Sequence, residues 1–315
     1  MLERPGIALT TAFFFDDCHD GSRDAARALT TDFPFAVTLV DGGPAPIPSA
    51  GRARRAAMTI GLDASGAVPH AVLLSTDADS RPRPDWLCAA LNALDHADMA
   101  AGRIVRIDSH LDPAQTQVEA YFDRLYAIRR TLDPVAWDTR EGCHYSGAAN
   151  LAFRADAYRA LGGFPAIATA EDARLLDDAA RAGMRVRHEP AMIVDTSSRR
   201  IGRVHGGLAT ALGDFANGSV PMVGQPAAAI WQYRRHAQAR GAFARLDDAL
   251  VRHALAQSIG STADHVLGVG RDCPNAEAFA MRIVPAAPGH DQSVPLAQAM
   301  AALAAFEEDC YRPSA

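Results

Sequence analysis

Two carboxylates stand one residue apart in the stretch LLSTDADSRPRPDWL, residues 73–87. They follow the apolar run HAVLLST at 70–76, which is typical of a buried strand, so Asp77 and Asp79 are expected at a strand's carboxyl end. Ligands of open α/β sheets bind outside such ends. Paired acids there suit a calcium loop, an aspartyl-phosphate phosphatase or a divalent metal that holds a diphosphate.

The neighbouring residues separate these three alternatives. A calcium loop of the EF-hand type needs glycine at its sixth position, where Pro82 stands, so that alternative fails. A phosphatase would have a small hydroxyl residue in place of Arg81 and a downstream cation, usually lysine, but the chain has no lysine. It stays open as a third alternative.

A metal–diphosphate site fits the pair best. Mg²⁺ or Mn²⁺ takes one or two carboxylates together with phosphate oxygens. Alternation along an extended chain points one acid at the metal and the other at the ribose or at a neighbouring cation. A simpler alternative is that Asp77 and Asp79 only cap the turn before Pro82.

The elements around this pair predict an α/β fold. Short apolar runs alternate with Ala-rich helical patterns, which is the rhythm of βαβ units and of a mostly parallel sheet flanked by helices. Strands are expected at 6–15, 35–40, 70–76, 99–107 and 184–195, and helices at 22–33, 50–63, 85–95, about 114–131 and 169–183. Beyond about 215 the chain becomes Ala-rich helix, so we expect domains at 1–215 and 216–315, the second a helical appendage.

Composition excludes several function classes. The 315 residues are 49% hydrophobic and carry a net charge of −6 without basic blocks, which argues against nucleic-acid binding. Five widely spaced cysteines favour a reducing, cytoplasmic setting, and the absence of lysine excludes a Walker or Schiff-base lysine. No apolar stretch approaches the roughly 20 residues of a membrane span, although peripheral membrane contact stays open.

Asp172 has two competing interpretations. Thr169 is expected as the N-cap of the helix 169–183, and an acid three residues later completes a capping box that is worth about 1 kcal/mol. An acid in a helix's first turn at a cleft edge is also well placed to remove a proton from a hydroxyl.

Six motifs in order resemble the family 2 glycosyltransferases of the GT-A fold, most closely their soluble bacterial members. The resemblance covers residues 6–215 and lies in FFFDDCHDGSRDAA, AGRARRAAM, LLSTDADSRPRPDWL, GAANLAFRADAYRALGGFP, TAEDARLLDDAARAGMRV and TSSRRIGRVHGG. It implies an enzyme that moves a sugar from a nucleotide-diphosphate sugar to an acceptor hydroxyl with inversion and with Mg²⁺ or Mn²⁺. The acceptor, whether saccharide, lipid or small molecule, is not identified by the resemblance.

The resemblance assigns the donor pocket to two segments. The acid-rich turn with Asp16, Asp17 and Asp20 resembles the nucleoside pocket, in which Asp16 matches the residue that reads the base. Gly51 and Arg54 resemble the glycine and arginine beside the donor phosphates. Glycine at a helix start also favours an anion site on physical grounds.

The resemblance also assigns the reaction centre. Asp79 is similar to the metal ligand, and Asp77 to the acid that supports the donor. The segment from Gly147 to Asn150 resembles the floor of the sugar and acceptor pocket. Asp172, preceded by Glu171, resembles the catalytic base of the inverting ED motif, and with this resemblance catalysis outweighs capping.

The last motif contributes cations. Arg199 and Arg203 are expected to clamp the donor diphosphate as bidentate forks, with a solvated basic turn as the alternative. His205 is a further candidate metal ligand, for which a structural or exposed histidine is the alternative.

The chain departs from the family pattern at its start. Family members carry an additional strand and helix before the segment that matches residues 6–20. A non-catalytic nucleotide-binding or partner-binding relative of the fold is therefore the second functional hypothesis. The Q-x-x-R-W motif of processive polysaccharide synthases is absent, which argues against such a synthase.

Overall fold

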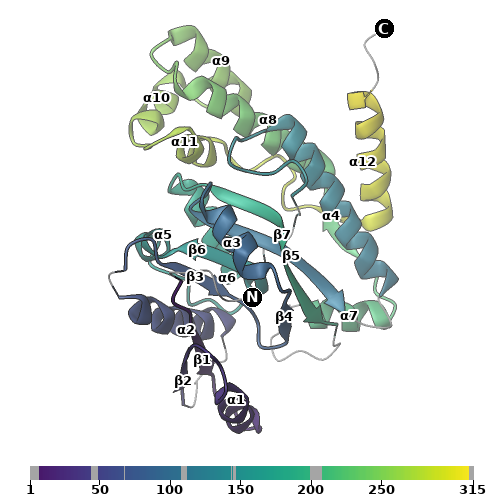
Figure 1. The fold of residues 1–315 in the computed structure, drawn as a ribbon. Coiled ribbons are helices and arrows are strands. Elements are labelled where there is room, and N and C mark those ends of the chain that lie inside the picture. Colours follow the sequence, from purple (N-terminus) through teal and green to yellow (C-terminus); the bar gives the residue numbers. More distant parts are fainter. Residues whose placement is uncertain are drawn as a thin grey trace.

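The computed structural model describes residues 7–43, 49–66, 68–107, 112–142, 144, 147–198 and 208–311 (Figure 1). Its strands are β1 (Thr10–Phe15), β2 (Ala36–Asp41), β3 (Val72–Ser75), β4 (Ser80–Pro82), β5 (Met99–Ile107), β6 (Leu151–Arg154), β7 (Val186–Ser197), β8 (Met222–Gly224) and β9 (Ser293–Pro295). Its helices are α1 (Ser22–Thr30), α2 (Ala50–Ser65), α3 (Trp86–Leu94), α4 (Pro113–Leu132), α5 (Ala155–Ala160), α6 (Glu171–Arg181), α7 (Leu208–Ala216), α8 (Pro226–Phe243), α9 (Ala249–Ile259), α10 (Ala263–Arg271), α11 (Ala276–Ile283) and α12 (Leu296–Tyr311), with a short 3₁₀ helix at Ala148–Asn150.

A central five-stranded sheet has the order β3-β6-β5-β7-β4 and is flanked by helices, which confirms the predicted α/β class. The expectation of a mostly parallel sheet is wrong for this sheet. Only β5 and β7 pair in parallel, because β6 runs back between β3 and β5, and β4 lies antiparallel on β7. The strands β3, β5 and β7 still share one direction, so their carboxyl ends lie at one edge.

Strands β1 and β2 form a separate parallel pair, with Thr10 opposite Ala36. Among the described residues neither strand joins the five-stranded sheet, which differs from the single sheet expected. Helix α2 packs against both β1 and β3 and so connects the two sheets.

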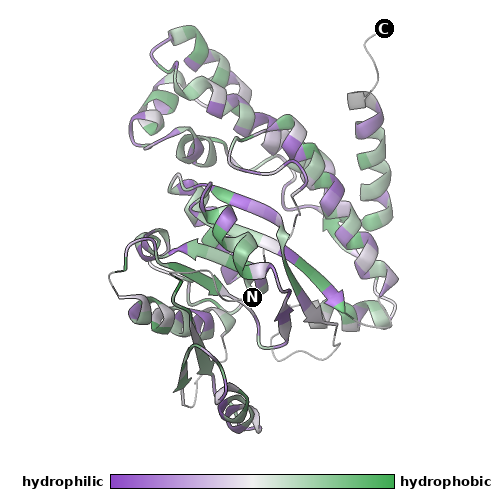
Figure 2. Cartoon of the chain, viewed as in Figure 1, coloured by the Kyte–Doolittle hydropathy of each residue, from purple (hydrophilic) through white to green (hydrophobic). Residues whose placement is uncertain are grey.

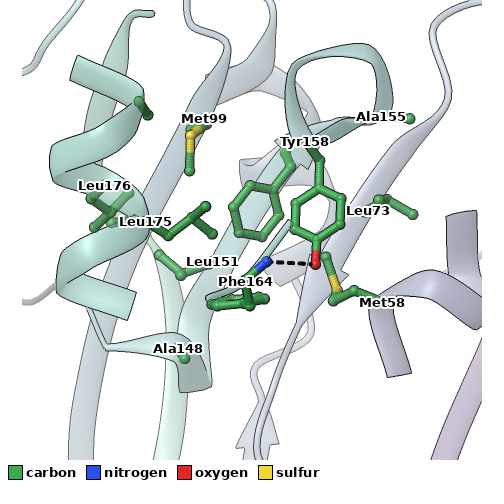
Figure 3. Packing of buried hydrophobic residues seen from close by; sticks show 13 residues of the cluster. Met58, Leu73, Met99, Ala148, Leu151, Ala155, Tyr158, Phe164, Leu175 and Leu176 are labelled. Carbon is green, nitrogen blue, oxygen red and sulfur yellow. Dashed lines mark hydrogen bonds between the residues drawn. The ribbon is translucent and has the colours of Figure 1, made fainter. Parts of the chain in front are cut away.

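The core lies on both faces of the central sheet, because successive side chains of a strand point to opposite faces. On one face Met99, Leu151 and Phe153 pack with residues of α2 and α6. Figure 3 shows Met99 and Leu151 in this cluster beside Tyr158 and Phe164. On the other face Ala100 and Ala152 pack under α3. Helix α3 is correspondingly apolar along its length (Figure 2).

The C-terminal helices form two further clusters of buried side chains. Helices α8 to α11 pack around Phe279 and Leu255, while α4, α8 and α12 pack around Tyr121 and Leu303. The short antiparallel pair β8–β9 interrupts the helical pattern expected beyond 215. The boundary between two domains at 215 stays a prediction. Within the described residues, no helix is both long and apolar enough to cross a bilayer.

Candidate functional site

Arg54 connects two segments that lie far apart in the chain. Its Nε donates to Glu171 Oε1 at 2.7 Å, and its Nη1 donates to Asp77 Oδ1. Asp77 follows β3, and Glu171 is the first residue of α6. One guanidinium on α2 therefore holds the D-x-D loop beside the start of α6.

Burial and charge both act on this cluster. The Glu171 side chain is only 5% exposed, and Arg54 is mostly buried. Burial opposes the charge on Arg54, but Asp77 and Glu171 outweigh it and hold the pKa of Arg54 above its ordinary value. A buried glutamate is tolerated here because a cation neutralises it.

The D-x-D loop lies between β3 and the short strand β4. The N–H of Ser80 donates to Asp77 O at 3.0 Å, and its hydroxyl bonds Thr196 Oγ1 at 2.9 Å, which fixes the loop to β7. The Asp77 carboxylate binds Arg54, a contact that the interpretation of that acid as a simple turn cap does not explain. Asp79 is half-buried in the same loop.

Helix α6 does not begin with the expected capping box. Its N-cap is Ala170, in the left-handed region at φ 59°, and no side chain caps the helix. Asp172 instead accepts the Ala148 N–H on Oδ2 at 2.9 Å and the Ala173 N–H on Oδ1 at 2.7 Å. The acid thus connects the start of α6 to the 147–150 segment, and Thr169 takes no part in capping.

Asn150 differs from its expected place in a ligand pocket. It is completely buried; its Oδ1 accepts Trp86 Nε1–H at 2.7 Å, and its Nδ2 donates to two backbone oxygens at 2.8 Å. These oxygens belong to Arg103 and Met192, where the β5–β7 register shifts. Because both amide hydrogens of Asn150 bond to these backbone oxygens, the side chain connects β5 to β7 and cannot contact a ligand in this structure.

Gly147, at the other end of that segment, lies against β5. A Cβ added there would come 2.7 Å from Ile104 Cδ1, so glycine permits the close approach. Its assignment to an acceptor pocket stays a prediction.

Gly51 permits another close approach. A Cβ added to Gly51 would lie 2.2 Å from Pro165 O and 2.7 Å from Ile167 O. The Gly51 N–H already donates to Ile167 O at 3.3 Å, as does the Ser49 hydroxyl at 2.8 Å. The start of α2 is thus packed against the 165–167 segment, and the role of Gly51 beside a donor phosphate stays a prediction.

The acid-rich turn after β1 is internally paired. Asp16 forms an ion pair with Arg52, and Asp17, at φ 52°, lies 2.9 Å from His19 Nε2. Asp20 Oδ1 accepts the Ser22 N–H at 3.1 Å at the start of α1. Their assignment to a nucleoside stays a prediction.

Sequence reasoning did not single out Ser49 and Arg52. Ser49 is the N-cap of α2 and accepts the Arg52 N–H. A serine directly before an Ala-rich helical pattern was the available signal. Arg52 lies two residues before Arg54 on α2, and it connects α2 to the acid-rich turn through Asp16, as Arg54 connects α2 to the D-x-D loop through Asp77.

Three predicted residues cannot be placed. Arg199, Arg203 and His205 lie outside the described residues. Within the described part of the chain, no group of three or more His, Cys, Asp or Glu side chains is arranged to hold a metal.

No family model matches this chain, and no curated protein matches. Two solved structures of glycosyltransferases are similar to it. One is a mannosyltransferase from Pyrobaculum calidifontis in complex with GDP-Man and Mn²⁺, at 17% identity and a TM-score of 0.42, over 96% of this chain and 71% of that one. The other is GalNAc-T7 with UDP, GalNAc and Mn²⁺, at 13% identity and a TM-score of 0.44, over 86% of this chain and half of that one.

Proposed function

We propose that this chain is an inverting, metal-dependent glycosyltransferase that moves a sugar from a nucleotide-diphosphate sugar to an acceptor hydroxyl. The observation that carries the proposal is the Arg54 bridge between Asp77 and Glu171. It brings the D-x-D loop, suited to a diphosphate, next to the first turn of α6, which carries the candidate base. The ordered series of six motifs supports the same function.

Asp172 is the proposed general base. A carboxylate has about four lone-pair sites, and the two backbone N–H bonds of Asp172 occupy only part of them. The remaining capacity accepts the proton of the acceptor hydroxyl. That oxygen attacks the anomeric carbon as the bond to the donor diphosphate breaks, and the two backbone bonds keep the carboxylate oriented.

Asp79 is the proposed ligand of Mg²⁺ or Mn²⁺. Its hard oxygen donors suit these ions, which bind through one or two protein carboxylates and take their other ligands from substrate phosphates and water. A cluster of three protein ligands is therefore not required. The bound ion would neutralise charge on the leaving diphosphate.

The first test is calorimetric titration of the full chain with UDP and GDP, in Mn²⁺ and then in excess chelator. We expect metal-dependent binding of one nucleotide, which Asp79→Asn abolishes. Binding that persists in chelator and in this variant would contradict the role of Asp79.

The second test addresses Asp172. Asp172→Asn should abolish sugar transfer or donor hydrolysis while nucleotide binding persists. Asp177→Asn, on the same helix but in an exposed ion pair with Arg181, is the matched control and should retain activity. Equal activity of both variants would remove Asp172 from the mechanism.

A non-catalytic nucleotide-binding protein is the second candidate. It is favoured by the separation of β1 and β2 from the central sheet and by the pairing of Asp16 with Arg52. Nucleotide binding without metal-dependent transfer or donor hydrolysis would select this alternative.

A further inference from the structure

A second candidate ligand site lies between α8 and α12, apart from the acids described above. A cavity of about 380 Å³ opens there, within the range of roughly 300–1,000 Å³ typical of small-molecule sites. Helix α8 contributes Ile230, Trp231, Arg234 and Arg235, and α12 contributes Ala302 and Phe306. In Figure 1, α12 is the yellow helix near the C-terminus.

The wall of the cavity is mainly apolar, and it includes the guanidinium groups of two arginines, each stacked on an aromatic ring. Arg234 lies over the Phe306 ring at 5.3 Å, and Arg235 lies over the Trp231 ring at 5.4 Å. A guanidinium that stacks through its face keeps its N–H edge available for a carboxylate or similar anion. Arg235 Nη1 also donates to Gln238 Oε1 at 3.2 Å, which occupies part of its edge, whereas the described residues give Arg234 no hydrogen-bond acceptor. The two rings therefore hold two guanidinium groups beside an apolar wall, with the edge of Arg234 the more available.

Within the described residues, no ion pair balances the charge of Arg234 or Arg235. Helix α8 itself contains no Asp or Glu. Glu307 of α12 is engaged by Arg124. The buried Nε of Arg235 has no hydrogen-bond partner. An anion would supply the missing charge, and an apolar body would fill the rest of the cavity.

We propose that the cavity between α8 and α12 binds a small amphiphilic monoanion, with a carboxylate-type head on Arg234 and Arg235 and an apolar tail against Ile230, Trp231 and Phe306. The site is independent of sugar transfer. Trp231 in its wall makes occupancy measurable by fluorescence.

The test is titration of the full chain with decanoate below its micellar concentration, followed by Trp emission. We expect a saturable change with one site per chain, lost in Trp231→Phe, and much weaker binding of 1-decanol and decyltrimethylammonium. Equal binding of the alcohol, or no saturable binding, would overturn the proposal.

Variants locate the site. Ala302→Phe should block it, because this exposed position on the rim of the cavity has room for a larger side chain. Arg234→Gln with Arg235→Gln should weaken decanoate binding by roughly tenfold or more, since each charge-assisted bond is strong. Arg271→Gln, an exposed arginine at the end of α10, is the matched control and should bind normally. Unchanged calorimetric affinity in the blocked or doubly substituted chain would contradict the assignment.

Two alternative occupants are distinguished in the same preparation. Sedimentation with anionic vesicles but no binding of monomeric decanoate would indicate a membrane surface instead. A dimer in solution that Ala302→Phe dissociates would indicate a second copy of the chain. Either result would overturn the proposal.

Discussion

Arg54 is the residue on which the geometry of the candidate site most depends. Its removal would leave Glu171 almost fully buried without its cation. We expect Arg54→Met to lower the free energy of unfolding by about 3 kcal/mol, the usual cost of breaking a buried pair. Urea denaturation measures this loss, with the exposed Arg55→Gln as the neighbouring control.

A double-mutant cycle separates the energy of the Arg54–Glu171 ion pair from the other effects of replacing Arg54. Because the loss arises from an uncompensated carboxylate, Glu171→Gln in the Arg54→Met background should recover part of the stability. If Arg54→Met were no more destabilising than Arg55→Gln, or if the double variant lost the sum of the single effects, the bridge would not be stabilising.

Residue types were predictable from the sequence, but partners were not. The D-x-D acids and the ED pair are visible as motifs, and the structure brings Asp77 and Glu171 to one guanidinium. Asn150 also lies in a motif, yet its amide is buried and joins strands. A polar side chain can be buried there only because it has hydrogen-bond partners 42 and 64 residues away in the chain. Local sequence does not encode such partners.

At the scale of the element, α2 contains two glycines with opposite expected effects. A methyl group at Gly51 would collide with backbone oxygens of the 165–167 segment, whereas one at Gly61 meets Leu73 Cδ2 at 3.5 Å, which is ordinary contact. We expect Gly51→Ala to lower the unfolding free energy by about 2 kcal/mol through overpacking. Gly61→Ala should raise it by about 0.5 to 1 kcal/mol through helix propensity.

Chemical denaturation of both variants checks this pair of effects. The substitution and the helix are the same, so differences in unfolded-state entropy largely cancel. An unfolding free energy that rises in Gly51→Ala as well would show that the 165–167 segment yields without cost.

Element positions were predictable for a physical reason, while their caps and pairings were less so. The strand predicted at 99–107 matches β5, because its first residues, Met99 to Ala101, are buried on both faces and continuous in apolarity. The start of α6 was misassigned, since Thr169 has the right type for an N-cap while the chain turns at Ala170 instead. Strand β4 was missed because three residues that include Pro82 carry no periodic signal.

At the scale of the whole molecule, the buried His236 and the partly buried His144 make stability depend on pH. Burial, with Arg240 and Arg129 nearby, lowers the pKa of His236 to about 3, and burial lowers that of His144 to about 4. The unfolded chain takes up these protons near pH 6.5, but the folded chain does not. The contribution of these histidines to the free energy of unfolding is therefore fully present above pH 6.5, and it is lost as the pH drops toward 4.

Unfolding at pH 7, 6 and 5 checks this expectation. His236→Gln should flatten the slope, because that position then takes up no proton in either state. The Asp138 carboxylate acts below this pH range. Burial raises its pKa, but His188 and Tyr126 outweigh burial and lower the pKa to about 2. Its contribution to the free energy of unfolding is therefore present above pH 3.8 and lost toward pH 2. Equal or greater stability at pH 5 would contradict the prediction for the histidines.

The class of the fold followed from the alternation of strands and helices, but the separation of β1 and β2 from the central sheet did not. Strand order and direction depend on which edges meet in space, and the apolar runs at 10–15 and 36–41 look the same in a separate pair as in a central sheet. The direction of β6 likewise depends on the path of the chain from α4 to β6, which periodicity does not record.

The separate pair β1–β2 has a consequence for the rate at which its amide hydrogens exchange with deuterium. A two-stranded sheet is marginal by itself, so β1 and β2 should open locally more often than the central strand β5 and exchange faster. The Asp16 turn follows β1 directly, so a nucleotide that bound there would have to hold the pair closed. Its binding would then appear as slowed exchange in β1 and β2, with β5 unaffected.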